Sequence, residues 1–245
     1  MRSMVWLLSE FVHGKSLSIA DMPVRMDVRG IGLSDWEGYA QPLTNKLSYV
    51  NTFYTRQPAL DITAPPAELC GQMDFVMSSD VFEHVQPPVA AAFAGAAQLL
   101  KPGGALLLSV PYTTAVATTE HFPNLYKFEI MEQDGEKILV NQRRDGSVER
   151  FSDLRFHGGE GHTLEMREFC RDHLITLCHG SGLGKIMILS ECLAHGIRWD
   201  DEDSLPIIAW KKVDASESAH TRVAAMTFDD SAKSLPTHKL HDLCE

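Results

Sequence analysis

The 245-residue sequence has no apolar run approaching the roughly 20 residues that a membrane-spanning helix requires. Its N-terminus carries one arginine and only a short apolar run before Glu10. A signal peptide needs about 7–15 apolar residues followed by a small-residue cleavage site, and neither is present. We therefore expect no membrane partner and no export signal.

Basic residues are scarce, because 22 Lys and Arg stand against 33 Asp and Glu, for a formal net charge of -11. A protein of this charge repels the phosphate backbone, so we expect no nucleic-acid partner. The balance of 44% hydrophobic and 22% charged residues is typical of a globular chain. The length suits one domain with a lid or a tail.

Cysteines are few, and they form neither a CxxC pair nor any metal-ligand spacing; they are Cys70, Cys170, Cys178, Cys192 and Cys244. Reduced, mostly buried thiols are the simplest interpretation, which favours a cytoplasmic location. The sequence predicts no metal site.

The clearest structural pattern lies in the middle of the chain. Residues 73–80 read as a buried strand, and apolar residues at helical spacing follow in 89–100. Pro87 and Pro88 suit the entry to this helix. Residues 105–110 are apolar without alternation, as in a strand that is covered on both faces. Together these segments predict a right-handed βαβ unit of a parallel sheet.

Weaker patterns extend this unit in both directions. We expect a first strand at 16–21, a weak helix at 37–46, a β-rich segment at 48–54, a short apolar run at 59–62, a helix at 168–178 and strands at 185–189 and 205–210. This alternation predicts a doubly wound, mainly parallel α/β sheet with helices on both faces.

Two segments depart from the alternation. Residues 127–152 hold two Asp-Gly turn signals, which predict small antiparallel hairpins in an insertion at about 114–160. This insertion is either a lid over the ligand edge or a structural appendage or dimer contact. After Lys212 the composition shifts to Ser, Asp, Thr and His, so we expect one domain over 1–212 and a mostly disordered tail over 213–245.

The segment MDFVMSSDVFEHVQPPVAAAFAGAAQLLKPGGALLLSVP resembles the central block of class I, Rossmann-like S-adenosylmethionine-dependent methyltransferases. Weaker similarity covers about residues 16–212. The resemblance implies a seven-stranded-type sheet, S-adenosylmethionine as cofactor and methyl transfer. The acidic charge and the hairpin insertion favour a small-molecule or sugar-like acceptor over nucleic acid, and we expect a monomer or homodimer.

By the same resemblance, Asp61 lies where the family contacts the adenine of the cofactor, and Ser79 and Asp80 lie where it contacts the methionine end. Asp61 alternatively serves as a turn or cap acid, and Asp80 as an N-cap. The residues that follow, Glu83 and His84, usually support the cofactor loop in this family, so we expect a structural role for them.

The glycine-rich loop of the family is degenerate in this sequence. Ala20 stands where its first glycine would follow a strand at 16–21, and the alternative is the pair Gly30 and Gly32. The ribose-binding acid of the second strand is replaced by neutral groups, of which Asn51 can form hydrogen bonds. This departure leaves open a non-catalytic binding or scaffold protein of the same fold.

Methyl transfer requires alignment of the two reactants more than elaborate catalytic groups, because the sulfonium is already activated. A hydroxyl acceptor would benefit from a base, and histidine is the usual choice near neutral pH. The candidates are His121, His157 and His162, each of which is alternatively a surface or packing residue. A nicotinamide-dependent oxidoreductase is disfavoured, because no glycine fingerprint is followed by an acid about 20 residues on.

Overall fold

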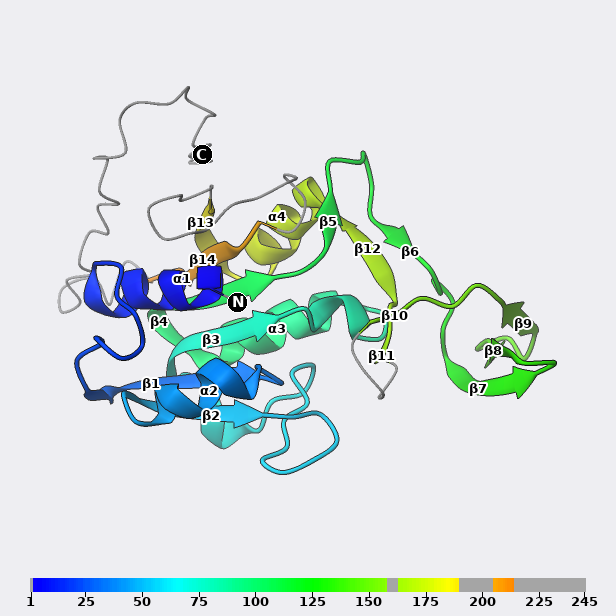
Figure 1. Ribbon diagram of the computed structural model, residues 1–245. Coiled ribbons are helices and arrows are strands. Elements are labelled where there is room, and N and C mark those ends of the chain that lie inside the picture. The colour runs from blue at the N-terminus through cyan, green and yellow to red at the C-terminus, as the bar shows by residue number, and fades with distance from the viewer. Residues whose placement is uncertain (1, 158–162, 190–204, 214–245) are drawn as a thin grey trace, which may run out of the picture.

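The computed structural model describes residues 2–157, 163–189 and 205–213 and contains a central six-stranded sheet in this part of the chain. Its strands are β1 (Arg25–Leu33), β2 (Leu47–Thr52), β3 (Met73–Ser79), β4 (Leu100–Ser109), β13 (Leu183–Ile188) and β14 (Ile207–Lys211). They lie in the order β13-β14-β4-β3-β1-β2 (Figure 1). β1 to β4 are parallel, whereas β14 is antiparallel to both of its neighbours. The mainly parallel sheet is therefore confirmed.

Helices cover both faces of this sheet, as predicted. On one face, α1 (Arg2–His13) and α2 (Glu37–Thr44) contribute Leu7 and Leu43 to a core that also contains Phe75 and Met77 of β3. On the other face, α3 (Ala90–Leu99) and α4 (Arg171–Gly180) pack in a second core around Val76 of the same strand. No helix in the described part of the chain is long and apolar enough to cross a membrane.

The βαβ unit forms where the sequence predicts it, with β3, α3 and β4 in succession. α3 ends at Leu99 and β4 begins directly after it, with an irregular register to β3 before Ala105. Pro102, Gly103 and Gly104, which follow the helix, therefore belong to the irregular first part of β4.

The expected first strand at 16–21 is wrong, because these residues form a loop and turn after α1. The first strand is β1, which lies between β2 and β3. Only its last four residues are buried, and Arg25 and Asp27 in its exposed half form an ion pair at 2.6 Å. Met26 and Val28 alternate with charged residues in this half, but Gly30 and Gly32 interrupt the pattern and read as a loop, so the sequence analysis placed no strand there.

The segment after β2 departs from the seven-stranded pattern. The apolar run at 59–62 makes a single parallel bridge, between Phe53 and Ala59, and no strand. The chain between these two residues is too short for a crossover helix. It then continues through η1 (Ala67–Leu69) into β3. The face of β2 that such a helix would cover in a full βαβ unit is consequently open.

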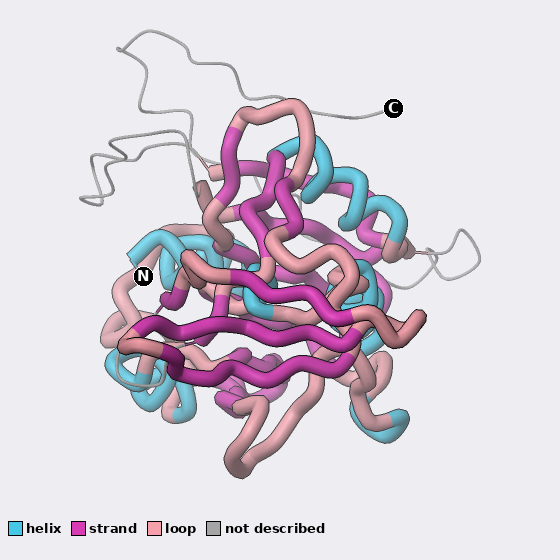
Figure 2. Tube along the Cα trace, turned by 90° about the vertical axis from the view of Figure 1, so that its right-hand side faces the viewer, coloured by secondary structure: helices cyan, strands magenta, loops and turns pink. Residues whose placement is uncertain are grey.

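The insertion after β4 is built from short strands and one three-stranded antiparallel sheet of β7 (Lys127–Gln133), β8 (Glu136–Gln142) and β9 (Val148–Phe151). Figure 2 shows this sheet facing the viewer. Asp134 and Gly135 turn between β7 and β8 with positive φ angles of 53° and 82°, and Gly146 does so between β8 and β9. The predicted hairpins are confirmed.

The remaining short strands connect the insertion to the central domain. They are β5 (Tyr112–Thr113), β6 (Thr119–Glu120), β10 (Phe156–His157), β11 (Thr163–Leu164) and β12 (Arg167–Cys170). β12 pairs with both β5 and β6, which is why the helix expected from residue 168 begins only at Arg171. The insertion has a small core of its own, formed by Phe122, Leu139, Leu164 and Met166. The expected tail, from residue 214 onward, lies outside the described residues.

Candidate functional site

The parallel strands β1 to β4 end at a common edge, where α/β sheets bind ligands. The loop after β1 contributes a buried carboxylate to this edge. Its Asp35 is buried, with 3% of its surface exposed, and accepts hydrogen bonds of 2.6 Å from the hydroxyls of Tyr39 and Tyr49. Burial raises the pKa of Asp35 to about 6, although both tyrosine hydrogen bonds act in the opposite direction.

Asn51, near the end of β2, holds this loop in place through side-chain hydrogen bonds to the backbone of Asp35. Its side-chain oxygen accepts a hydrogen bond of 2.9 Å from the Asp35 N–H, and its side-chain nitrogen donates one of 2.8 Å to the Asp35 carbonyl. Because the oxygen and the nitrogen of its side-chain amide both bond the loop backbone, Asn51 is a residue that positions the loop.

The two glycines of β1 provide space for side chains of this protein itself. A Cβ added to Gly30 would collide with the ring of Phe75, and one added to Gly32 would collide with the Tyr49 hydroxyl and the Asp35 carboxylate. The space that a glycine-rich loop would leave for a cofactor is thus filled here by Tyr49 and Asp35.

The structure separates Ala20 from the rest of the predicted cofactor residues. Its carbonyl accepts a hydrogen bond of 2.8 Å from the ammonium of Lys46, which directly precedes β2. Ala20 therefore lies by the amino end of β2, whereas Asn51, Ser79 and Asp80 lie at or directly after the carboxyl ends of strands.

The end of β3 presents the predicted Ser79 and Asp80 together with Ser109 of β4. The two serine hydroxyls are 2.9 Å apart, and the Asp80 N–H donates a hydrogen bond of 2.8 Å to the Ser109 carbonyl. Asp80 adopts a positive φ of 54° and its side chain is exposed. This arrangement directs an accessible carboxylate to the edge of the sheet beside two hydroxyl groups.

Asp61 is exposed but does not lie at a strand end adjacent to that of Asp80. It follows the Phe53–Ala59 bridge beyond β2, and β1 lies between β2 and β3. Its Oδ1 atom accepts hydrogen bonds from the N–H (2.9 Å) and hydroxyl (2.7 Å) of Thr63. The alternative interpretation of Asp61 as a turn acid thus has direct contacts to support it.

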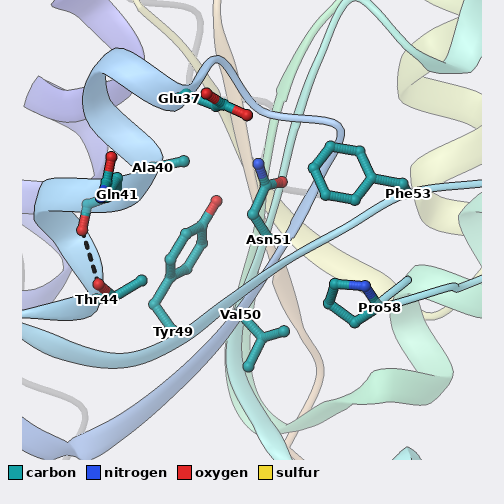
Figure 3. Close-up of a pocket in the computed structure, with 9 residues that line it drawn as sticks. All are labelled: Glu37, Ala40, Gln41, Thr44, Tyr49, Val50, Asn51, Phe53 and Pro58. Carbon is teal, nitrogen blue, oxygen red and sulfur yellow. Dashed lines mark hydrogen bonds between the residues drawn. The ribbon is translucent and has the colours of Figure 1, made fainter. Parts of the chain in front are cut away.

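A pocket of about 470 Å³ lies between α2 and β2 (Figure 3). Glu37, Asn51 and Phe53 line it near the carboxyl end of β2. Arg56 lies 3.7 Å from the centre of the Phe53 ring and 3.9 Å from the Glu37 carboxylate. Sequence reasoning missed Glu37 and Phe53, because a lone acid at a helix start and a lone aromatic residue carry no motif.

Two of the three predicted histidines meet on one carboxylate. The Nε2 atoms of His121 and His157 lie 2.8 and 2.5 Å from the two oxygens of Glu165, which is 4% exposed. Glu165 follows β11 and had no signal in the sequence. His162 lies outside the described residues.

The loop containing Glu83 and His84 joins this cluster from η2 (Phe82–His84). Burial raises the pKa of Glu83 to about 8, and the negative charges of Asp80 and Glu165 act in the same direction. Burial lowers the pKa of His84. Because Asp80 interacts electrostatically with both residues, the cluster lies beside the end of β3.

Arg167 anchors this loop to the insertion. Its buried guanidinium donates hydrogen bonds to the carbonyls of Phe82 (3.0 Å) and Val85 (2.6 Å) and pairs with Glu120 at 2.7 Å. The supporting role expected for the loop therefore has a physical basis, and the sequence contained no signal for Arg167.

Comparison with known proteins identifies the family of this chain. A family model described as a methyltransferase domain matches residues 22–173, which is more than half of the chain. The chain belongs to this methyltransferase family. The resemblance to class I S-adenosylmethionine-dependent methyltransferases and the expectation of a methyltransferase enzyme are thereby confirmed. Comparison with curated proteins gave no match.

Several solved structures are similar in outline. A S-adenosylmethionine-dependent methyltransferase from Clostridium acetobutylicum ATCC 824 is 10% identical, with 86% of this chain and 92% of that chain covered and a TM-score of 0.49. The amino pentose methyltransferase CalS10 from Micromonospora echinaspora is 13% identical, covering 76% and 84% with a TM-score of 0.45. A methyltransferase from Mesorhizobium loti is 14% identical, covering 78% and 94% with a TM-score of 0.47.

Proposed function

We propose that this methyltransferase holds S-adenosylmethionine along the carboxyl ends of β1, β2 and β3 and methylates a small-molecule or sugar-like acceptor. The observation that carries the proposal is the exposed carboxylate of Asp80, held at the end of β3 beside Ser79 and Ser109 within the segment that matches the family. Such a carboxylate suits the cationic amino-acid end of the cofactor, since charge-assisted hydrogen bonds are about twice as strong as neutral ones.

The other end of the cofactor fits the pocket beside β2. Glu37 offers a carboxylate that can accept hydrogen bonds from a ribose diol. Glu37 would thereby take the place of the ribose-binding acid that β2 lacks. Phe53 provides an apolar face of the kind against which an adenine ring stacks. The second oxygen of Asp61 remains a candidate acceptor for the adenine amino group. Gly30, Gly32 and Asn51 act by positioning the loop that borders this site.

When bound, the cofactor supplies an activated methyl group on a sulfonium. The chain then has to orient the acceptor, exclude water and receive a proton if the acceptor is a hydroxyl. His121 and His157 are the base candidates among the described residues. Each can donate its Nε2 proton to Glu165 and keep Nδ1 free to take a proton, as in other carboxylate-oriented imidazoles.

The acceptor class is inferred from charge and from the insertion. The net charge of -11 disfavours polyanionic acceptors. The β7–β9 sheet lies beyond the carboxyl ends of the parallel strands (Figure 1), as suits a lid of the domain proposed over 1–212. Cys70, Cys170 and Cys178 are free thiols, which supports a cytoplasmic location.

A second candidate function is a non-catalytic binding protein of the same fold. It is favoured by one observation: Tyr49 and Asp35 fill the space above Gly32 that would otherwise admit a cofactor. In this case the exposed carboxylate at the end of β3 would have no cationic ligand.

Equilibrium dialysis of the full chain with labelled S-adenosylmethionine tests the proposal. We expect binding that weakens in Asp80→Ala and is unchanged in Asp145→Ala, an exposed acid in the β8–β9 turn. Failure to bind at millimolar cofactor would refute the proposal. Binding without transfer of label to any of a panel of hydroxyl-bearing metabolites would favour the non-catalytic candidate.

A further inference from the structure

We propose that Glu83, His84 and His157 form a binding site for a single divalent transition-metal cation such as Zn²⁺. One potential ligand atom from each of the three residues lies within 4.8 Å of the others. The residues come from η2 and β10, which are distant in sequence. The sequence therefore gave no metal-ligand spacing, and this proposal departs from the expectation that no metal is bound.

The Glu83 side chain provides the first argument. It has no exposed surface, and neither carboxylate oxygen has a hydrogen-bond partner in the described part of the chain. The histidine nitrogens beside it are His84 Nε2 at 3.6 Å and His157 Nδ1 at 4.0 Å, and both distances are too long for a hydrogen bond. Buried carboxylates without partners are unfavourable, and a cation between these three atoms would satisfy the group.

The protonation of the two histidines provides the second argument. His84 Nδ1 lies 2.9 Å from the Leu164 carbonyl, which can only accept, so Nδ1 carries the proton and Nε2 presents a lone pair toward Glu83. His157 Nε2 lies 2.5 Å from a Glu165 oxygen, so its lone pair is on Nδ1, which also faces Glu83. Histidines that ligate metals nearly always donate their other N–H to a carbonyl or a carboxylate in this way.

The ligand set indicates the kind of cation. Two imidazoles and a carboxylate suit Zn²⁺, Fe²⁺ or Co²⁺ and not Mg²⁺ or Ca²⁺, which prefer oxygen. Bonds of about 2.0–2.1 Å in a tetrahedral site place ligand atoms roughly 3.4 Å apart. The separations of 3.6 and 4.0 Å from the Glu83 oxygen require only a small contraction, and the two imidazole nitrogens, which lie within 4.8 Å of each other, have to approach as well. Arg167 and the Met166 N–H, which bonds the Glu83 carbonyl at 2.8 Å, hold the loop in place.

Three protein ligands leave an open position on a tetrahedral cation. Since the cluster lies beside Asp80, this position suits an oxygen atom of the methyl acceptor, and that consequence rests on the proposed function. The cation would occupy Nδ1 of His157 and leave His121 as the imidazole that receives a proton. Cation binding itself does not depend on the cofactor.

The test uses the full-length protein after chelator treatment. Binding of Co²⁺ is measured by calorimetry and by the visible ligand-field bands of Co²⁺. We expect uptake of a single cation with the visible bands. His84→Ala and His157→Ala should abolish both signals, and Glu165→Gln should weaken binding about 10–100-fold, as is usual for the outer partner of a ligating histidine. His179→Ala is the control, an exposed histidine whose Nδ1 lies 3.2 Å from the Leu183 carbonyl, and it should bind normally.

Absence of stoichiometric Co²⁺ uptake, or uptake that persists in both His84→Ala and His157→Ala, would overturn the proposal. Glu83→Gln keeps the shape of the buried side chain without a charge, so it serves if an alanine variant does not fold; retained binding in this variant also counts against the site. Dialysis with labelled S-adenosylmethionine is run in parallel. The cation result and the cofactor result are independent, so each proposal can fail alone.

Discussion

The buried carboxyl group of Asp35 leads to a quantitative prediction about stability and pH. Its pKa is raised from 3.8 to about 6 in the folded protein, chiefly by burial. Between these values the folded state holds a proton that the unfolded state has released, so the contribution of Asp35 to stability falls as pH rises from about 4 to 6 and is constant above. The separation of the two pKa values corresponds to about 3 kcal/mol, at about 1.4 kcal/mol per tenfold change in the protonation equilibrium.

Asp35→Asn should remove this dependence. The amide has nearly the same shape and does not titrate, and its oxygen and nitrogen can each meet one of the hydroxyls of Tyr39 and Tyr49. The free energy of unfolding of the variant, minus that of the parent, should therefore increase by about 3 kcal/mol between about pH 4 and pH 7. The difference isolates Asp35, because all other titrating groups are common to both proteins.

Urea denaturation of both proteins across this pH range is the measurement. Asp145→Asn serves as the control, since Asp145 is exposed and hydrogen bonds from Ser147 lower its pKa; its difference from the parent should not rise with pH. A difference for Asp35→Asn that stays constant within about 0.5 kcal/mol would refute the reasoning, because it would mean that the carboxyl is not destabilised by burial.

Three further predictions concern the cofactor edge, β1 and the C-terminal segment. Asp80→Ala should weaken S-adenosylmethionine binding by roughly ten- to a hundredfold and Asp61→Ala by at most about tenfold, as measured by calorimetry on folded variants; equal binding by both variants and the parent would place the crevice elsewhere. Gly32→Ala should destabilise the fold by about 1–3 kcal/mol in urea, because the added methyl meets the Tyr49 hydroxyl, and Tyr49→Phe should recover part of the loss. Truncation after Val213 should leave cofactor affinity and melting temperature unchanged; a drop of several degrees would show that the removed segment is part of the fold.

The sequence alone determined the elements whose signals are local. The βαβ unit of β3, α3 and β4 followed from two apolar runs and a helical period, and the hairpins followed from Asp-Gly turns that need positive φ angles. The family block at residues 73–111 also lies within continuous sequence. By contrast, β1 was missed because Gly30 and Gly32 read as part of a loop, although Met26 and Val28 alternate with charged residues in its exposed half.

Only the tertiary structure decided which side chains meet. Gly32 read as part of a cofactor loop until the fold placed Tyr49 and Asp35 in the space above it. The sequence offered His121 and His157 as separate candidates, and the fold of the insertion places both against the Glu165 carboxylate. The contacts of Gly32 with Tyr49 and of His121 with Glu165 join residues that are far apart in the chain. No local period encodes them, because they depend on how strands and loops pack once the sheet has formed.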